Sequence, residues 1–378
     1  MFSLRTIIPI IAGLLILSWT AVAPAASEGF STGSGPKMFQ PMETSAFPSL
    51  ESAIRIKGPI TFCGEFVPIH LPEVRERLEK ELLLMLWDRA QIILWLKRTG
   101  RYFPYIQTAL DAARMPSDLK YVAVIESALK PHAGSSKGAR GVWQFIPATG
   151  RKYGLTVNRY IDERRNFRLA TKAALQYLKD LKEQFGSWTL ACAGYNMGES
   201  GLEKRIKHQE VKDYYRLDLP NETERYVLRA IAAKLILADP ARYGFDMQPG
   251  DYYRPRKYDR VRLKHKYSAP IVIVAKAAGT YYKTIKDMNP QFLNHVIPGG
   301  ENTVFLPEGA AKGFAKRYQP LIEKYRKQFK GRTYTVRRGD TLTRIAQKNK
   351  IPLWKLLKLN NLSRNSVIKP GQKLVIMK

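Results

Sequence analysis

A series of helix-period segments between residues 70 and 240 constrains the fold more than any other feature. Pro72 is a favoured first helical residue, and a broad apolar stripe follows it towards Thr99. Its members are Leu78, Leu82, Met85, Leu86, Ile92, Ile93 and Leu96. Gly100 predicts the end of this helix. We expect further helices near 103–114, 117–129, 168–185, 187–197 and 223–238. Residues 70–240 are therefore predicted to form an all-α domain.

The N-terminal 26 residues have the pattern of a secretory signal peptide. Arg5 precedes an apolar stretch from Ile7 to Trp19, and an Ala-x-Ala pattern follows at 21–26. The stretch is shorter than the roughly 20 residues of a membrane span, and an uncleaved anchor is the alternative. No Cys precedes Cys63, so no lipobox cysteine is present. We expect export to the periplasm or cell envelope, and the Ser-, Gly- and Pro-rich residues 27–69 read as a flexible linker.

The chain is strongly basic, with 63 Lys plus Arg against 32 Asp plus Glu and a net charge of +31. Such a charge attracts nucleic acid, anionic lipid or an acidic wall polymer, and charge alone does not choose among them. Export and the absence of nucleic-acid motifs exclude nucleic acid as the partner. Peripheral association with the membrane or envelope stays open. The five His are scattered, so no metal site is predicted, and we expect Cys192 to be a buried thiol.

Two small α+β units follow the helical domain. The clearer one, 333–378, reads as strand, helix, helix, strand, with Asn360 after the second helix and the turn Pro370-Gly371 before the last strand. A degenerate copy over 265–308 begins with the apolar run 271–275. The predicted fold class is therefore α+β multidomain, with small βααβ modules behind the all-α domain. A Lys/Arg-rich helix near 310–330 is expected between the modules.

Glu126 is the one charged side chain in the middle of an apolar run, 119–129. A carboxyl group in an apolar pocket has its charged form disfavoured, so its pKa rises and it can hold a proton near neutral pH. That property suits a general acid. The alternative is a buried Glu paired within the helical core, with Arg140 as the partner.

The motifs around Glu126 resemble the soluble lytic transglycosylase (SLT) family of lysozyme-like enzymes, which cleave bacterial peptidoglycan. The resemblance rests on Glu126-Ser-Ala-Leu-Lys-Pro, Gly141-Val-Trp-Gln144 and Gly194-Tyr-Asn-Met-Gly198, within a motif core at 117–200. The Glu222-Thr-x-x-Tyr-Val227 element and a C-terminal LysM-like module point to the subgroup of membrane-bound lytic murein transglycosylase D.

The resemblance implies a single-carboxylate reaction on the MurNAc–GlcNAc β-1,4 bond that forms 1,6-anhydroMurNAc ends without water or cofactor. Glu126 would carry both proton transfers, because Asp162, Glu163 and Glu199 are flanked by polar residues and look solvated. The substrate-binding residues implied are Ser135, Gln144, Tyr195, Asn196, Tyr226, Gly141 and Trp143. Helix capping and core packing are the competing roles for these side chains.

The LysM resemblance implies binding of GlcNAc-MurNAc glycan strands by the C-terminal module. The implied glycan-binding residues are Gly339, Asp340, Thr341, Asn360, Pro370 and Gly371. A hydrolytic muramidase and a catalytically silent peptidoglycan-binding scaffold are the two rival functions. For the 265–308 unit, glycan binding and a spacer role both stay open.

Overall fold

The structure is a computed structural model that describes residues 48–330, 333–360 and 362–376. The predicted signal peptide, 1–26, and residues 27–47 of the predicted linker lie outside this range. Within the described part of the chain, no helix is both long enough and apolar enough to cross a membrane.

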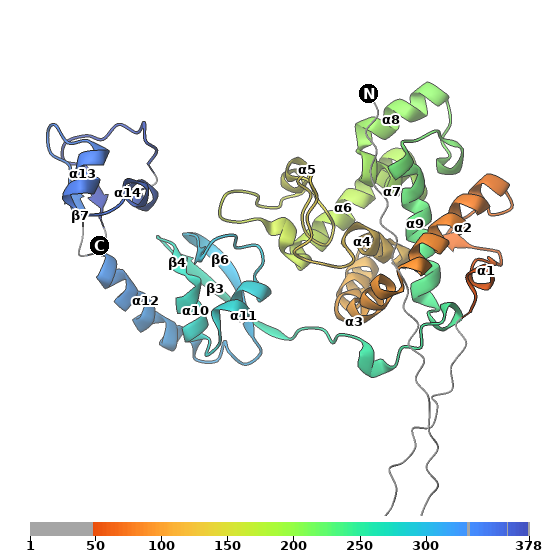
Figure 1. Cartoon of the computed structure of the whole chain (residues 1–378), viewed down its shortest axis with the longest axis horizontal. Helices are drawn as coiled ribbons and strands as arrows, with labels where there is room; N and C mark the ends of the chain where they lie inside the picture. The colour runs from red at the N-terminus through yellow and green to blue at the C-terminus, as the bar shows by residue number, and fades with distance from the viewer. Residues whose placement is uncertain (1–47, 331–332, 361, 377–378) are drawn as a thin grey trace, which may run out of the picture. The chain divides into compact units, whose positions relative to one another are not determined.

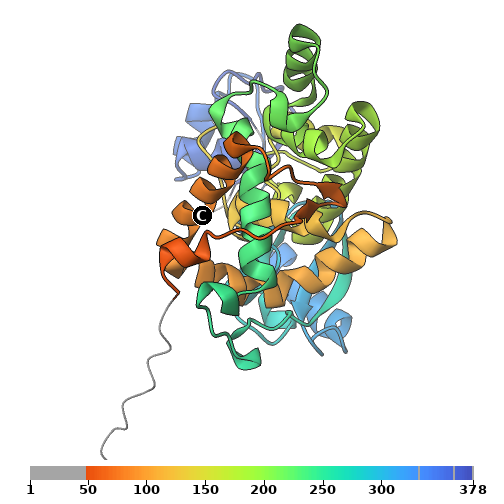
Figure 2. The same ribbon diagram turned by 90° about the vertical axis from the view of Figure 1, so that its right-hand side faces the viewer.

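The first 200 described residues form a helical domain in which α9 (Asn221–Ala238) packs against three other helices (Figures 1 and 2). Its partners are α2 (Pro72–Trp87), α4 (Lys120–Ser127) and α7 (Trp188–Met197). Further α-helices of this domain are α3 (Arg89–Ala112), α5 (Pro147–Lys152), α6 (Phe167–Phe185) and α8 (Glu199–Gln209). The predicted all-α character of this domain is confirmed, while α5 and α8 were not predicted.

The first predicted helix is two helices, and Gly100 does not end the second. Asp88 separates α2 from α3, and its side chain accepts the Gln91 backbone N–H at 3.1 Å. α3 then runs through Gly100 and Pro104. A Cβ at Gly100 would lie 2.7 Å from the Cβ of Tyr252, so the glycine is needed for close packing inside a helix. The predicted stop was wrong because packing requires the small residue here.

Residues 48–69 are not the predicted flexible linker. They contain α1 (Leu50–Ala53) and a hairpin of β1 (Thr61–Phe62) and β2 (Glu65–Phe66), and Phe62 has no exposed surface. The Glu65 carboxylate accepts the Thr189 backbone N–H at 3.0 Å at the start of α7. An anion at a helix N-terminus is stabilising, so this segment belongs to the helical domain. Cys63 and Cys192 are both buried free thiols, as expected for Cys192.

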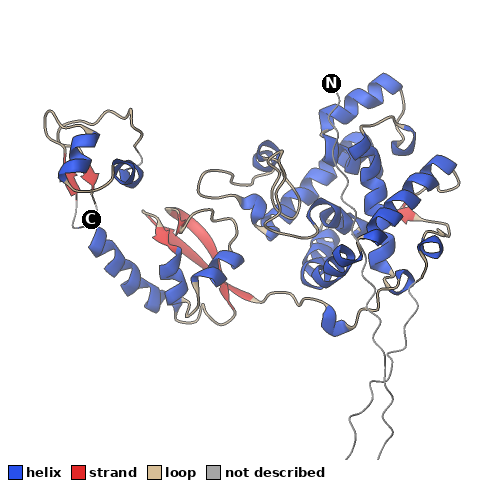
Figure 3. Cartoon of the chain, in the orientation of Figure 1, coloured by secondary structure: helices blue, strands red, loops and turns tan. Residues whose placement is uncertain are grey.

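Two βααβ units follow (Figure 3). The first consists of β3 (Tyr258–His265), α10 (Ile271–Ala277), α11 (Tyr282–Met288) and β6 (Gly300–Pro307), and β3 pairs antiparallel with β6. Short strands β4 (Ala269–Pro270) and β5 (Val296–Ile297) also pair. The unit begins at 258 rather than at the predicted 265, because its first strand lies in the basic, Tyr-rich stretch that precedes the apolar run 271–275. That run is a helix.

The expected connecting helix is α12 (Phe314–Lys330), and its residues Phe314, Tyr318 and Ile322 complete the core of the first unit. The second unit consists of β7 (Thr333–Thr335), α13 (Leu342–Lys348), α14 (Leu353–Asn360) and β8 (Lys373–Val375). β7 and β8 pair antiparallel, and the unit has its own small apolar core. The predicted strand–helix–helix–strand order is confirmed.

A short backbone pairing joins the first unit to the helical domain. The Asp162 N–H donates to the Gln291 carbonyl at 2.8 Å, and the Leu293 N–H donates to the Tyr160 carbonyl at 2.9 Å. Between them, Ile161 forms an antiparallel bridge with Phe292. We call this pairing of 160–162 with 291–293 the seam.

Candidate active site

Glu126 lies near the C-terminal end of α4 and is partly buried. The Tyr226 hydroxyl, from α9, donates a hydrogen bond of 2.5 Å to Glu126 Oε1. Burial raises the pKa of Glu126 to about 7, against the opposing effects of the Tyr226 hydrogen bond and the Arg229 charge. A carboxyl group with this pKa can both give and take a proton near neutral pH.

The cleft around Glu126 has two lobes. The broad lobe is a cavity of about 830 Å³ and the narrow lobe one of about 360 Å³. Both are lined by Ile125, Glu126, Ser135 and Gln144. The carboxyl group therefore stands where the two lobes meet, and a long chain-like substrate can lie on both sides of it.

The structure brings five of the seven substrate-binding residues implied by the sequence to the broad lobe. They are Ser135, Gln144, Tyr195, Asn196 and Tyr226. Tyr195 donates its hydroxyl proton to the Trp143 carbonyl at 2.7 Å, and Asn196 Oδ1 accepts the Thr223 hydroxyl at 2.7 Å. Among the described residues, the Asn196 amide NH₂ donates no hydrogen bond of its own, whereas Oδ1 is occupied, so the NH₂ is the end of that side chain with capacity for a ligand.

Gln144 and Ser135 belong to the loop between α4 and α5. Gln144 has φ +47° and donates from Nε2 to the Gly141 carbonyl at 2.7 Å. Ser135 Oγ accepts the Ala139 backbone N–H at 3.2 Å, and its hydroxyl proton is left to donate. Both side chains are thus anchored within the loop and line both lobes of the cleft.

Trp143 and Gly141 do not line the cleft, and their assignment as substrate-binding residues was wrong. Trp143 has no exposed surface, and its indole N–H donates to Thr171 Oγ1 at 2.9 Å in the core. A Cβ at Gly141 would lie 1.8 Å from the Arg164 carbonyl oxygen, and φ is +84°. Gly141 therefore serves the close approach of two backbone segments rather than the approach of a sugar.

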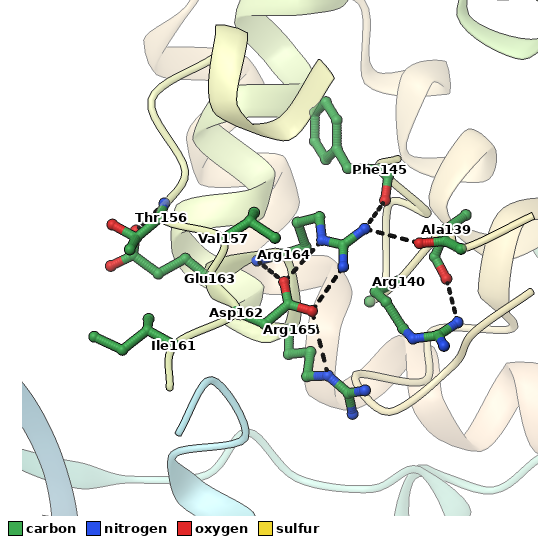
Figure 4. Close-up of polar contacts among 12 residues, drawn as sticks. Ala139, Arg140, Phe145, Thr156, Val157, Ile161, Asp162, Glu163, Arg164 and Arg165 are labelled. Carbon is green, nitrogen blue, oxygen red and sulfur yellow. Dashed lines mark hydrogen bonds and ion pairs between the residues drawn. The ribbon is translucent and has the colours of Figure 1, made fainter. Parts of the chain in front are cut away.

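A buried ion pair holds this loop from behind (Figure 4). Arg164 donates from Nε to Asp162 Oδ1 and from Nη2 to Oδ2, both at 2.8 Å, and both side chains are 6% exposed. Arg164 Nη1 also donates to the carbonyls of Gly138 at 2.8 Å and Phe145 at 2.9 Å. Asp162 is therefore buried, whereas the sequence suggested that it is solvated. It positions Arg164, which hydrogen-bonds to both ends of the loop segment that carries Gln144.

Two further carboxylates line the broad lobe. Glu199 accepts hydrogen bonds from Lys152 Nζ at 2.9 Å and the Tyr177 hydroxyl at 2.8 Å, and the Lys152 bond foremost lowers the pKa of Glu199. Glu222 is exposed and lies 3.6 Å from Lys137 Nζ. Glu199 is thus a partly buried, paired anion rather than a proton donor at neutral pH. Glu126 is the carboxyl group in the described cleft whose pKa is raised.

Sequence reasoning missed the residues of the narrow lobe that α3 supplies. Trp95 is 8% exposed, and its indole N–H and the amide Nε2 of Gln91 are buried without a hydrogen-bond partner. Both residues line the narrow lobe. Their i, i+4 spacing places them on one helix face, which was the available signal. Arg229, also missed, lines the broad lobe beside Glu126.

In the second βααβ unit, the residues implied for glycan binding build its turns. Asp340 Oδ2 accepts the Arg337 backbone N–H and the Tyr334 hydroxyl, each at 2.8 Å, and these bonds lower the pKa of Asp340. Thr341 Oγ1 caps α13 by accepting the Arg344 N–H at 3.2 Å. Gly339 and Gly371 both have φ +86°, and Pro370 precedes the second of these turns.

Asn360, the remaining residue of that set, uses its whole amide inside the second unit. Its Nδ2 donates to the carbonyls of Leu356 at 2.8 Å and Val375 at 2.9 Å, and its Oδ1 accepts the Val375 N–H at 2.7 Å. Asn360 therefore clamps the end of α14 to β8.

Comparison with known proteins agrees with this geometry. The profile of the transglycosylase SLT domain matches residues 104–217, and that of the LysM domain matches residues 334–376. Membrane-bound lytic murein transglycosylase D of Escherichia coli is 33% identical over 331 residues, which cover 83% of this chain and 72% of that protein. The chain belongs to this family. It is a lytic murein transglycosylase with a LysM peptidoglycan-binding domain.

Other similarities cover smaller parts of the chain. A peptidoglycan transglycosylase of an Escherichia phage is 34% identical over 126 residues, 32% of this chain and 9% of that protein. Among solved structures, the 70 kDa soluble lytic transglycosylase of Escherichia coli aligns with a TM-score of 0.33 and 18% identity, over 48% of this chain and 31% of that one. An inactive mutant of the lytic transglycosylase Slt from Pseudomonas aeruginosa aligns with a TM-score of 0.30 and 19% identity, over 40% and 26%.

Proposed function

We propose that Glu126 acts alone as acid and then as base in the cleavage of the MurNAc–GlcNAc β-1,4 bond. The observation that carries this proposal is a carboxyl group with a pKa of about 7 at the junction of the two lobes. The usual two-carboxylate hydrolysis also needs an ionised partner that is free to activate water or to attack the sugar. The two other carboxylates of the broad lobe are engaged elsewhere, since Glu199 is held by Lys152 and Tyr177 and Glu222 is exposed beside Lys137.

The reaction follows from these positions. Protonated Glu126 gives its proton to the glycosidic oxygen, and the C–O bond to the anomeric carbon of MurNAc breaks. The 2-acetamido oxygen of the same sugar stabilises the cation-like centre. The Glu126 carboxylate, stabilised by the Tyr226 hydroxyl, then removes the proton of the MurNAc 6-hydroxyl, whose oxygen attacks the anomeric carbon. The product is a 1,6-anhydro end, and Glu126 is protonated again.

The cleft residues have distinct roles in this proposal. The Asn196 amide NH₂ and the Ser135 hydroxyl donate to sugar acetamido and hydroxyl oxygens in the broad lobe. Tyr195 and Tyr226 orient the centre through their fixed hydroxyls. Trp95 and Gln91 offer two unpaired N–H donors to the part of the glycan in the narrow lobe. Buried donors of this kind gain most from an acceptor on the ligand.

The second βααβ unit tethers the enzyme to the wall in this proposal. Its exposed apolar side chains Trp354 and Val367, 64% and 85% accessible, are the ones to which we assign contact with the glycan. The relative is named as membrane-bound, and we propose an envelope location for this chain. The net charge of +31 adds a salt-sensitive attraction to wall carboxylates.

Glu126→Gln tests the catalytic assignment. The variant keeps the acceptor for Tyr226 and loses the proton, so lysis of purified sacculi should fall by about a thousandfold while co-sedimentation with them is unchanged. Mass spectrometry of the wild-type products should find anhydro ends, one water lighter than hydrolysed ends. Glu199→Gln is the matched control on the same lobe. A loss of more than about a hundredfold in the control, together with hydrolysed ends, would support a two-carboxylate hydrolase instead.

A further inference from the structure

A third cavity of about 390 Å³ lies beside the seam and shares no lining residue with either lobe of the cleft. It is enclosed by α3 and the start of α6 on one side and by β3, β6 and the end of α11 on the other. Its aromatic wall consists of Tyr102, Tyr105, Phe167, Tyr258 and Phe305. We call it the junction pocket.

Unpaired polar atoms gather in the wall of the junction pocket. Six side-chain N or O atoms are buried without a hydrogen-bond partner in the part of the chain that the structure describes, and three belong to residues of this wall. They are the hydroxyl of Tyr258, Oε1 of Gln291, whose residue is 4% exposed, and Nε of Arg165, which has an ion pair with Asp162 Oδ2 at 3.7 Å but no hydrogen bond. Buried polar groups are normally paired, so this concentration indicates a place where a ligand supplies the partners.

The junction pocket is also cationic. Arg101, Arg165, Arg168 and Arg256 line it, against the single carboxylate of Asp287. Lys283 lies 2.5 Å from that carboxylate and neutralises it. The Arg168 guanidinium is held over the Tyr105 ring at 4.2 Å and near the Tyr258 ring at 5.1 Å. A guanidinium fixed against aromatic faces is prepared to bind a planar carboxylate.

We propose that the junction pocket binds the acidic stem peptide of peptidoglycan. Carboxylates of the peptide bind the arginines, a peptide carbonyl or carboxylate accepts the Arg165 Nε–H, and a peptide N–H donates to Gln291 Oε1. Short aliphatic side chains pack on the aromatic wall. The inference rests on the proposed function for the presence of this polymer, and the pocket itself is separate from the reacting centre.

The Gln291 oxygen favours a peptide over an anionic lipid. The phosphodiester group of a lipid offers only acceptors to the arginines and leaves Gln291 Oε1 without a donor. A peptide supplies the acceptors and the donor together with apolar surface. A volume near 390 Å³ lies within the range of small-ligand sites and suits a few residues rather than a folded partner.

The test is calorimetric titration of the full chain with N-acetyl-alanyl-γ-D-glutamyl-diaminopimelate, a stem tripeptide without sugar. We expect one site per chain, and roughly tenfold weaker binding to Tyr258→Phe and Arg168→Gln, about the value of one hydrogen bond to a charged ligand. The fully amidated peptide should bind equally weakly. Tyr267→Phe, on an exposed tyrosine of the same unit, is the matched control and should bind as the wild type does.

Tyr258→Phe also separates ligand binding from a structural role. Its hydroxyl makes no hydrogen bond to any described residue, so its removal should leave thermal stability unchanged or raised while binding is lost. Equal affinity for wild type, Tyr258→Phe and Arg168→Gln, tighter binding of inorganic phosphate than of the peptide, or no binding at millimolar peptide would each overturn the proposal. Because the peptide lacks a glycosidic bond, this outcome is independent of whether anhydro ends are formed.

Discussion

In both βααβ units, one asparagine side chain joins the end of the second helix to the last strand, and the two units differ in what surrounds this clamp. Asn289 donates from Nδ2 to the carbonyls of Ile285 and Phe305 and accepts the Phe305 N–H, at 2.8–2.9 Å. Asn360 makes the corresponding bonds to Leu356 and Val375. One asparagine at the end of the second helix thus fixes the last strand in both units, and the outer surfaces are free to serve different purposes.

The outer surfaces differ at the loop after the clamp. In the first unit, residues 291–293 form the seam with the catalytic domain, and α12 completes the core. In the second unit, the corresponding stretch leads to Val367, which is 85% exposed, and the core is self-contained. The first unit is therefore part of the catalytic body, whereas the second has its surface available for the wall.

Breaking the buried pair behind the seam should have the largest effect. Arg164→Gln removes the closer of two cations from the buried Asp162 and leaves Arg165 Nε at 3.7 Å from Oδ2. Removing one partner of a buried ion pair typically costs about 3–5 kcal/mol of stability, and the remaining arginine places this variant at the lower end. The loop carrying Gln144 also loses two hydrogen bonds. We expect lower urea resistance and slower lysis, with wall co-sedimentation through the second unit retained.

Arg205→Gln is the control for that substitution, because Arg205 pairs with Asp218 on the surface and should contribute less than about 1 kcal/mol. An Arg164→Gln protein that unfolds at the wild-type urea concentration would contradict the role given to the ion pair. Equal loss of lysis and of wall binding would contradict the separation of the two units.

Replacing the clamp asparagine of each unit by alanine should have the next largest effect on stability. Asn289 has no exposed surface, so Asn289→Ala removes three hydrogen bonds made by a fully buried side chain and should cost about 3 kcal/mol. Asn360 is partly accessible, so Asn360→Ala should cost less. Urea unfolding checks the order. The first variant should lose lysis of soluble glycan fragments, and the second should lose wall co-sedimentation.

Asn349→Ala is the control for both clamps, since Asn349 donates a single hydrogen bond to Ile345 at the end of α13. Loss of lysis on soluble fragments in Asn360→Ala, or unchanged lysis in Asn289→Ala, would reverse the roles assigned to the two units.

The sequence predicted the residues that line the cleft better than the contacts that support them. Glu126 and Tyr226 could be chosen because a lone carboxyl group in an apolar run and a matching motif are local patterns. Trp143 looked like a cleft residue because the motif gives no direction for its side chain, which the Thr171 hydrogen bond decides. Asp162 looked solvated because its neighbours in sequence are polar, although its partner Arg164 buries it. The Trp143–Thr171 contact joins residues far apart in sequence, and the local Asp162–Arg164 pair is buried only because Arg164 also contacts Gly138 and Phe145. Neither contact has a local signal.

Replacement of the exposed Trp354 in the second unit should have a smaller effect, and on wall binding alone. Trp354→Ala should weaken co-sedimentation with sacculi roughly tenfold, because a stacked aromatic side chain contributes about 1 kcal/mol or more beyond its buried area. Stability should not change, since the side chain is 64% exposed. Tyr281→Ala, at an 81% exposed ring of the first unit, is the control. Weaker wall binding in the control instead would move the wall-binding surface to the first unit.

The N-terminus of the first helix in each βααβ unit provides the test with the smallest expected effect on stability. α10 begins after Pro270 without a side-chain cap, whereas Thr341 caps α13. Thr341→Ala should destabilise the second unit by about 1 kcal/mol, and Thr341→Ser, which keeps the hydroxyl, should restore its thermal stability. Because the cap uses only the hydroxyl, wall binding should return with it. If the Thr341→Ser variant had full stability but reduced wall binding, the threonine methyl group would contact the glycan. The first unit has Pro270 at the corresponding position, so it could not make that contact.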